Sequence, residues 1–335
     1  MKLLIFFTFI TYSYTYPINN NCDQACLSYL KKYGYLESSE SKNSTMSQLI
    51  TPTEGINNFQ KEAGFTPTGI IDDSLKKLIQ TPRCGVGYRT KRFSVVNKWK
   101  TSKNANNETI VSWYLDLSNY GQIQTNLTKN EIESIFVHSF NAWSKTALLY
   151  FKKVSNETDA NIVIKFLIGD HGDGFSFDGP GDVLAHAFYP DNGDIHLDNA
   201  EHWSTWGDDK SISLYSVAIH EIGHSLGLGH SSQSNSIMYA WYRPGYNTLN
   251  ENDDVIGINN IYGIRQKFKF GPINPTSTTT NPTTTINPIT TSTTTTRKKF
   301  TTKKYILNRG VNRVLIENSK VFIYPKSSQS LPLYL

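Results

Sequence analysis

The chain has 335 residues, of which 38% are hydrophobic, and it carries a formal net charge of +5. This length permits one sizeable core together with smaller parts. Part of the excess charge lies in "RTKR", which has no aromatic residue, and in "RKKFTTKK", which has one, so neither segment offers a series of aromatic stacking platforms among its charges. We therefore expect no nucleic-acid partner.

The N-terminus, residues 1–16, reads "MKLLIFFTFITYSYTY", with Lys2 followed by a short apolar run. The run is too short to span a bilayer and predicts a secretory signal peptide, with a buried N-terminal strand as the alternative. No later stretch is apolar for long enough to span, so we expect a secreted, extracellular protein. Four glycosylation sequons agree with the secretory route: Asn43, Asn107, Asn126 and Asn156.

Two folded parts follow. Residues 17–92 carry helical periodicity in "ACLSYLKKYGYL" and "EGINNFQKEAGFTPTGIIDDSLKKLIQ", with a turn at "TPTG". Residues 93–266 form the main domain, in which strand-like runs such as "ETIVSWYLDL" and "ANIVIKFLIGD" surround an amphipathic helix, "KNEIESIFVHSFNAWSKTA". The last predicted helix is "ENDDVIGINNIYG", with Asp253 and Asp254 in its first turn.

The C-terminal part differs in composition. Residues 267–304 become almost entirely Thr, Pro, Ser and Lys from about residue 272, and this predicts an extended, O-glycosylated linker. Residues 305–335 hold a few apolar residues and no motif, and we interpret them as a short tail.

The chain has three cysteines, an odd number for a secreted protein. Cys22 and Cys26 are close enough in sequence to bond to each other, which leaves Cys84 without a partner. The alternative is that Cys84 bonds to one of the other two.

Residues 217–245, "VAIHEIGHSLGLGHSSQSNSIMYAWYRPG", contain three histidines. His220 and His224 are four residues apart, so on a helix they lie on one face. Gly227 tolerates the left-handed conformation that ends a helix, and Gly229 lets the chain bring His230 back to the same point. Three converging imidazoles with no thiolate predict a zinc site with one open position.

Glu221 gives this open position its chemistry. It adjoins the first histidine, so its carboxylate lies beside the metal rather than on it. Zinc lowers the pKa of a bound water to about 7, and a neighbouring carboxylate can take that proton and pass it to a leaving amine. HExxH alone occurs by chance in many proteins, but the pattern HExxHxxGxxH is far more specific.

These residues resemble a known family. "HEIGHSLGLGH" followed by "SIMY" is similar to the metzincin zinc site with its Met-turn, in which Met238 forms an apolar floor beneath the metal. Ser231, directly after the third histidine, resembles the matrix metalloproteinases (matrixins) and not the astacins or adamalysins. The resemblance extends over roughly residues 27–265.

The resemblance implies an α+β fold of the metzincin type. We expect a mixed twisted sheet with long helices, an active-site helix that carries HExxH, and a small helical propeptide before it. It also implies a secreted zinc endopeptidase that acts on extracellular proteins, with matrix among the candidate substrates, and we expect a monomer. Secreted members often continue with a hemopexin-like propeller, which this chain is too short to hold.

A second cluster lies in "HGDGFSFDGPGDVLAHAFYPDNGDIHLDNAEHW". His171, Asp173, His186 and His196 can close a tetrahedral shell with no open position, which is typical of structural zinc. The family supplies two zinc-binding histidines around "LAHAF", so the resemblance implies these four ligands and a total of two zinc ions. His202 has no family counterpart, and we interpret it as a surface residue.

The resemblance also implies at least one calcium ion. Its ligands would be three carboxylates and three backbone carbonyls, because calcium takes six to eight oxygens: Asp178, Asp198 and Glu201, with Gly179, Gly181 and Val183. Further calcium sites are not expected, because Asn161 stands where the family usually has a ligating aspartate and Asn199 replaces an acidic residue.

The substrate cleft is likewise inferred from the resemblance. Leu184 and Ala185 lie on what resembles the family's edge strand, to which an extended peptide could add by main-chain hydrogen bonds. "YAWYRPG" resembles the wall of the main side-chain pocket, with Tyr242 matching the family's tyrosine and Ala240 replacing its usual proline. The small Ser216 indicates a deep apolar pocket, and hence a medium or large apolar residue just after the scissile bond.

"PRCGVGYRTKRF" resembles the family's cysteine switch, usually PRCGVPD. A thiolate is a good zinc ligand, so Cys84 would fill the open position and exclude water. Gly87 and Tyr88 replace the usual Pro and Asp. Because that Asp pairs with the arginine before the cysteine in the family, we expect Arg83 to lack this aspartate partner.

The segment "RTKR" predicts the activation step. Arg89, Lys91 and Arg92 match the basic site of furin-type proprotein convertases. The alternative is a run of solvated surface charges, which is what most such clusters are. Cleavage after Arg92 would release the switch and create an ammonium at Phe93. In family members trimmed there, this ammonium pairs with an aspartate of the last helix, which we assign to Asp253.

Two alternatives stay open at this point. One is a non-catalytic binding protein that retains the fold, which the intact Glu221 and three histidines disfavour. The other is a different metzincin such as an astacin, which Ser231 and the switch segment disfavour.

Overall fold

The computed structural model describes residues 24–36, 50–88 and 98–265, and the backbone of three strands between residues 305 and 325. The chain divides into two compact units, Met1–Lys269 and Phe270–Leu335. The expected signal peptide, the basic segment of the convertase site and the Thr-rich linker lie outside the described residues.

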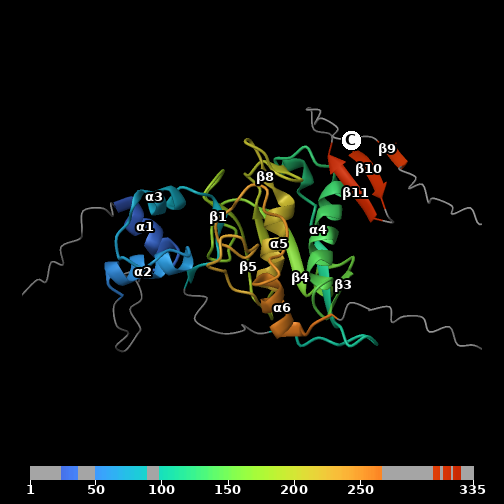
Figure 1. Cartoon of the computed structure of the whole chain (residues 1–335), viewed down its shortest axis with the longest axis horizontal. Helices are drawn as coiled ribbons and strands as arrows, with labels where there is room; N and C mark the ends of the chain where they lie inside the picture. The colour runs from blue at the N-terminus through green and yellow to red at the C-terminus, as the bar shows by residue number, and fades with distance from the viewer. Residues whose placement is uncertain are drawn as a thin grey trace, which may run out of the picture. The chain divides into compact units, whose positions relative to one another are not determined.

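The main domain is built on a six-stranded mixed sheet (Figure 1). Its strand order is β1-β5-β6-β4-β2-β3. Neighbouring strands pair in parallel except β5 and β6, which are antiparallel. The strands are β1 (Arg83–Cys84), β2 (Thr109–Leu115), β3 (Leu149–Lys153), β4 (Ile162–Leu167), β5 (Val183–Ala187) and β6 (Ile195–Asp198).

Two long helices, α4 (Lys129–Ser144) and α5 (Leu214–Ser225), pack against each other and against this sheet. Helix α4 begins with a capping box, in which Thr128 and Glu131 satisfy each other's backbone N–H groups. Its apolar side, which includes Phe136 and Trp143, is fully buried in the main core. The α+β fold expected for the chain is confirmed.

Smaller elements complete the main domain. Helix α6 (Asp254–Tyr262) follows the metal-site loops, and the strands β7 (Trp203–Ser204) and β8 (Ile212–Ser213) form a short parallel pair before α5. Two single turns of 3-10 helix, η2 (Tyr120–Gln122) and η3 (Glu157–Asp159), lie in connections.

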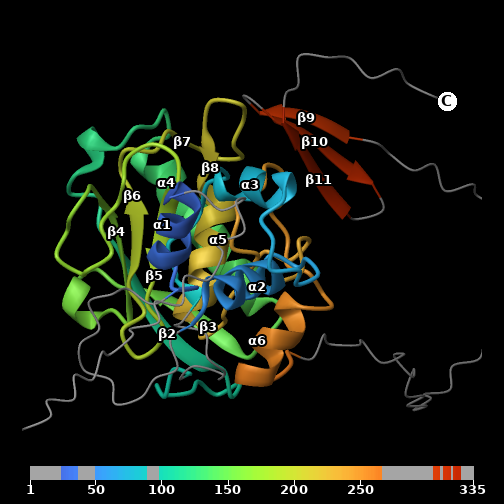
Figure 2. The same cartoon turned by 90° about the vertical axis from the view of Figure 1, so that its left-hand side faces the viewer.

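The first unit of the sequence is helical, as predicted. Its helices are α1 (Gln24–Lys32), α2 (Pro52–Glu62) and α3 (Asp73–Ile79), and they lie over the side of the domain that carries β1 and β5 (Figure 2). Gln60 holds the predicted "TPTG" turn, accepting from the N–H groups of Thr68 and Gly69 at 2.8 and 3.0 Å. The three helices share a small core with Val183 and with residues 239–241 of the main domain.

The C-terminal unit contains three antiparallel strands, β9 (Tyr305–Arg309), β10 (Asn312–Glu317) and β11 (Lys320–Pro325), with β10 in the centre. The sequence analysis had interpreted this part only as a short tail without a motif. Two residues separate each strand from the next, which is hairpin spacing, and the strands are rich in β-branched and aromatic residues. Among the helices that the structure describes, none is long and apolar enough to cross a membrane.

Candidate metal centre and peptide cleft

Helix α5 positions the first two histidines. Ser213 caps its N-terminus by accepting from the N–H of Ser216 at 3.1 Å. The helix ends at Ser225, and Gly227 follows with φ of 102°, a left-handed conformation that favours glycine. The chain then turns back, so that the ring of His230 lies 5.2 and 4.6 Å from the rings of His220 and His224. The convergence predicted from the spacing is confirmed.

Backbone carbonyls orient the two helical imidazoles. Nδ1 of His220 lies 2.7 Å from the carbonyl oxygen of Ile237, and Nδ1 of His224 lies 2.7 Å from that of Leu228. With Nδ1–H as the donor, each Nε2 presents a lone pair, and the two Nε2 atoms face each other at 3.1 Å. This is the tautomer that a metal ligand requires.

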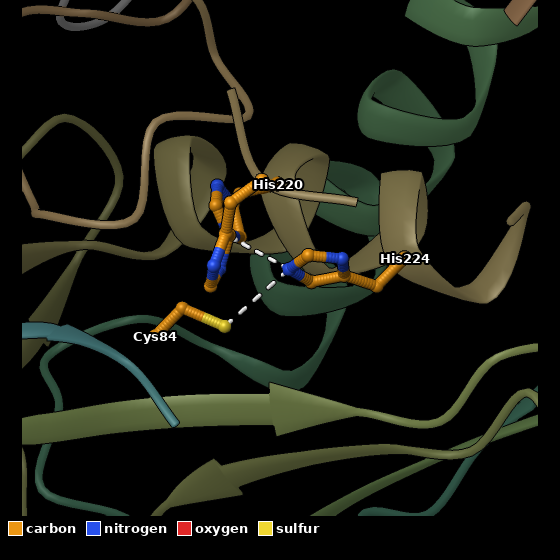
Figure 3. A group of neighbouring side chains, drawn as sticks. Cys84, His220 and His224 are labelled. Atoms are coloured by element: carbon orange, nitrogen blue, oxygen red, sulfur yellow. Dashed lines mark hydrogen bonds between the residues drawn. The ribbon is translucent and has the colours of Figure 1, made fainter. Parts of the chain in front are cut away.

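Cys84 supplies a fourth potential ligand to this group (Figure 3). Its Sγ lies 3.5 Å from Nε2 of His224, and one ligand atom from each of the four residues lies within 4.8 Å of the others. Cys84 is free and buried, whereas Cys26 is disulfide-bonded, so the alternative of a disulfide at Cys84 is wrong. Three nitrogens and one sulfur fit a tetrahedral zinc shell.

Glu221 lies in the same pocket as Cys84 and is only 1% exposed. Its Oε2 is buried and has no hydrogen-bond partner among the residues that the structure describes. Burial raises the pKa of Glu221 to about 8, against a small opposing effect from the Cys84 thiol. A carboxylate that lies next to the histidine cluster and is not one of its four ligand groups suits general acid–base chemistry.

Met238 lies beneath the metal-site helix. It is 2% exposed and packs on Gly223, where an added Cβ would come within 2.3 Å of the Met238 sulfur. The buried carboxylate of Asp254 holds this turn by accepting from the backbone N–H groups of Ile237 and Met238 at 2.8 and 3.2 Å. The sequence analysis had placed Asp253 and Asp254 together in the first turn of the last helix and gave Asp254 no role of its own. In the structure, Asp253 is partly exposed at the start of α6 and makes no side-chain cap.

The second histidine cluster also converges. Oδ2 of Asp173 lies 2.8–2.9 Å from Nε2 of His171, Nε2 of His186 and Nδ1 of His196. His186 and His196 are directly paired residues of β5 and β6. Three imidazoles and one carboxylate close a four-ligand shell, as expected for a structural metal.

The electrostatics of this cluster favour a cation. Burial lowers the pKa of His186 to about 4 despite the nearby Asp173, so its imidazole is neutral at pH 7 and able to ligate. Burial by itself would raise the pKa of Asp173. Hydrogen bonds from the backbone N–H of Phe175 and from His186 outweigh this effect and hold the pKa well below its ordinary value. His202 lies apart on the surface, as the sequence indicated.

The expected calcium ligands also lie together. Glu201 accepts from the N–H of Gly181 at 2.6 Å, and Asp178 accepts from that of Val183 at 3.2 Å. Oδ2 of Asp198 is buried without a hydrogen-bond partner in the described part of the chain. Burial, with Asp198 and Asp178 nearby, raises the pKa of Glu201 to about 7. The loop therefore has the donors and excess negative charge that suit a calcium ion.

Two polar contacts of this region were missed by the sequence analysis. Lys32 of α1 contacts the Asp178 carboxylate at 2.5 Å, so the helical unit touches the calcium loop directly. Asn161 uses its side-chain oxygen to accept from the backbone N–H of Ser112 at 2.9 Å, which links two strands of the sheet.

The expected peptide-binding edge is occupied by the chain itself. Strand β1 adds to β5 in parallel: the N–H groups of Arg83 and Gly85 donate to the carbonyls of Asp182 and Ala185, both at 2.7 Å. On its other side, Cys84 donates to the carbonyl of Ala240 at 2.9 Å. The switch segment thus lies between two segments of the main domain, as an extended peptide would.

A pocket opens beside this segment. It is lined by Leu184, Ser216, Ala240 and Tyr242, which the sequence analysis named, and by Val217 and Arg243, which it did not name as pocket residues. The Tyr242 hydroxyl accepts from the N–H of Ser213 at 2.9 Å, and Arg243 stacks on Tyr246 at 3.8 Å. The walls are mostly apolar, and a guanidinium lies among them.

The aspartate that pairs with this arginine in the family's motif is absent, as expected, because Tyr88 stands in its place, but a carboxylate of another helix lies near the Arg83 guanidinium. Its Nη2 lies 3.9 Å from Oε1 of Glu62, the last residue of α2. No sequence pattern pairs these two positions.

Comparison with known proteins agrees with the geometry. The matrixin family model matches residues 107–263. The chain is 38% identical over 295 residues to the probable matrix metalloproteinase 095L of Invertebrate iridescent virus 3, covering 76% of this chain and 81% of that protein. It is 37% identical over 245 residues to matrilysin of Rattus norvegicus, covering 71% and 85%.

A third relative is longer. The chain is 37% identical over 258 residues to the hatching enzyme of Paracentrotus lividus, covering 76% of this chain but 40% of that protein. The chain belongs to the matrixin family, the matrix metalloproteinases, and is a zinc metalloendopeptidase.

Proposed function

We propose that the protein is a secreted protease zymogen that hydrolyses peptide bonds of extracellular proteins. His220, His224 and His230 hold the catalytic zinc, Glu221 transfers the proton, and Cys84 keeps the enzyme latent. The observation that carries this proposal is the convergence of three imidazoles and one thiol at a single point, with a buried carboxylate in the same pocket.

The residues of the chain have separate tasks in this reaction. The zinc supplies Lewis acidity and lowers the pKa of water. Glu221 accepts a proton from the attacking water and delivers it to the leaving amine. Ala185 and Ala240, whose carbonyls now accept from the switch segment, would bind the backbone of an extended substrate instead. The side chain after the scissile bond would enter the pocket beside Ser216 and Tyr242.

Cleavage of a quenched peptide with an apolar residue after the scissile bond tests the activity. The chain freed of its propeptide should cleave it, and a zinc chelator should abolish cleavage. Absence of cleavage by a properly folded, zinc-loaded chain would contradict the proposal. Terminal-residue profiling of proteins cleaved in a complex extract would then identify the natural substrates, among which we include matrix proteins.

Activation is proposed to occur in the secretory pathway. A furin-type convertase cleaves after Arg92 and removes the segment that contains Cys84. Phe93 then begins the mature chain and its ammonium pairs with Asp253, which lies partly exposed at the start of α6. N-terminal sequencing of the secreted enzyme should find Phe93 first. Normal trimming of an Arg92→Ala variant would show that the convertase interpretation is wrong.

We further propose two zinc ions and at least one calcium ion per mature chain. The two four-ligand groups support the zinc count, and the carboxylate loop at Asp178, Asp198 and Glu201 supports calcium. Elemental analysis of the purified mature enzyme tests the count directly.

A further inference from the structure

Glu62 occupies an unusual place at the latent site. It is the last residue of α2 in the propeptide, yet its carboxylate is buried against the metal centre. Its Oε1 lies 3.1 Å from Nδ1 of His230 and 3.9 Å from Nη2 of Arg83. Its Oε2 accepts a hydrogen bond from the Tyr35 hydroxyl at 2.9 Å. One propeptide carboxylate therefore contacts both a candidate metal ligand and the residue next to Cys84.

Arg83 needs such an anion. The side chain is fully buried, and a guanidinium stays charged inside a protein. Tyr29 accepts one of its hydrogen bonds at 3.0 Å, and the rings of Tyr33 and Trp241 lie 3.9 and 4.8 Å from its central carbon. These neutral groups solvate the cation but do not neutralise it. A buried charge that loses its counter-ion is strongly destabilising.

The switch motif does not provide this anion. Tyr88 stands where the family's motif has its aspartate, and its ring stacks on Tyr35 at 5.1 Å. Among the described residues, the carboxylate that forms an ion pair with Arg83 belongs to Glu62, on a different helix; at 3.9 Å the contact is electrostatic and not a hydrogen bond. The stack on Tyr35 also orders the residue whose hydroxyl donates to Glu62.

We propose that Glu62 is the anchor of latency in this chain, a positioning residue that takes over the task of the missing switch aspartate. By pairing with Arg83 it fixes the backbone of Cys84, whose carbonyl accepts from Nε of Arg83 at 3.1 Å. By contacting Nδ1 of His230 it also orients the third histidine while the propeptide is bound. This inference rests on the proposed role of Cys84 as the latency ligand.

The test measures how well Cys84 is protected in the full-length, uncleaved zymogen. The purified chain is treated with iodoacetamide, and alkylation of Cys84 is followed by mass spectrometry. Glu62→Gln keeps the shape of the side chain but removes its charge, and we expect Cys84 to be alkylated about tenfold faster than in the wild type. Zinc should also be lost to a chelator faster, because a carboxylate behind a ligating histidine contributes roughly 10–100-fold to affinity.

Glu54→Gln is the matched control. Glu54 lies on the same helix and completes its capping box with Thr51, but it is exposed and belongs to the N-terminal end of the helix. This variant weakens α2 without touching Arg83 or His230, and Cys84 should react at close to the wild-type rate. Alkylation as fast as in Glu62→Gln would show that general loosening of the propeptide, not the Glu62 contact, exposes the thiol.

Tyr35→Phe keeps the test valid if Glu62→Gln does not fold. It removes the hydroxyl that donates to Glu62 at 2.9 Å and accepts from Nη1 of Arg83 at 3.4 Å, so it weakens the same Glu62–Arg83 arrangement, and we expect an increase of about threefold. If Cys84 is alkylated at the wild-type rate in both Glu62→Gln and Tyr35→Phe, the inference is overturned. If Glu62→Gln does not fold, a wild-type alkylation rate in Tyr35→Phe alone overturns it. Faster alkylation without peptide cleavage by the mature chain would instead contradict the proposed protease activity and leave the anchoring role of Glu62 supported.

Discussion

The two histidine clusters of this protein use similar ligands but differ in where the fourth ligand comes from. In the second cluster Asp173 lies two residues from His171, and all four ligands belong to the main domain. In the first cluster the fourth group is Cys84, on strand β1, which follows the N-terminal helical unit and pairs with β5. A shell closed from within one domain is permanent, whereas a shell closed by a removable segment can be opened by cleavage of the chain.

The supports of the two clusters differ in the same way. His186 and His196 are fixed by the pairing of β5 with β6. His220 and His224 are fixed by backbone carbonyls of the main domain, but His230 contacts a propeptide carboxylate. Under the proposed zymogen mechanism, the catalytic cluster is therefore the one whose environment changes when the N-terminal helical unit is removed.

Removal of the fourth ligand should give opposite results at the two clusters. Asp173→Ala should reduce bound zinc from two ions to one per chain, because three imidazoles on strands and a loop lose their shared anionic partner. Cys84→Ala should retain both ions, since three histidines suffice for a catalytic zinc. Elemental analysis measures the count, and an unchanged count in Asp173→Ala would remove the structural site.

Glu221→Ala should separate metal binding from catalysis. Both zinc ions should stay, because the ligands are intact, while kcat/KM of the mature enzyme should fall by roughly 10²–10⁴-fold with loss of the proton acceptor. Zinc analysis together with peptide hydrolysis checks this. Loss of zinc along with activity would show that the role of Glu221 is wrongly assigned.

Calcium removal should lower stability without emptying either histidine cluster. The carboxylates of Asp178, Asp198 and Glu201 repel one another without a cation, and burial intensifies this. At calcium concentrations about 100 times the Kd, the bound ion contributes about 2.7 kcal/mol, or roughly 5–10 °C in Tm. Differential scanning calorimetry with a calcium-selective chelator tests this, and an unchanged Tm would argue against the site.

The smallest effect is expected in the side-chain pocket beside the catalytic cluster. Ser216→Leu should fill the pocket and reduce the preference for a large over a small apolar residue after the scissile bond by about tenfold. Ser216 and Val217 both line this pocket. Because Ser216 is not a metal ligand, the zinc content should stay unchanged. A peptide library compares the two enzymes; preference for charged residues in the wild type would contradict the apolar pocket.

The sequence by itself determined the parts of the site that depend on local spacing. Helical periodicity places His220 and His224 on one face, and Gly227 ends the helix where the pattern requires a turn. His186 and His196, which the resemblance to the family singled out, lie on the strands β5 and β6. These features follow from the fixed geometry of helices and strands, which a sequence motif reports directly.

Only the tertiary structure decided which distant groups meet. Glu62 pairs with Arg83, Lys32 reaches Asp178, Asp254 holds the Met238 turn, and the switch segment occupies the edge of β5. No periodicity links these positions, because each pair joins separate elements whose packing depends on the whole core. A buried charge takes whichever opposite charge the packing brings near, so a lost partner in one motif can be supplied by a carboxylate on another helix.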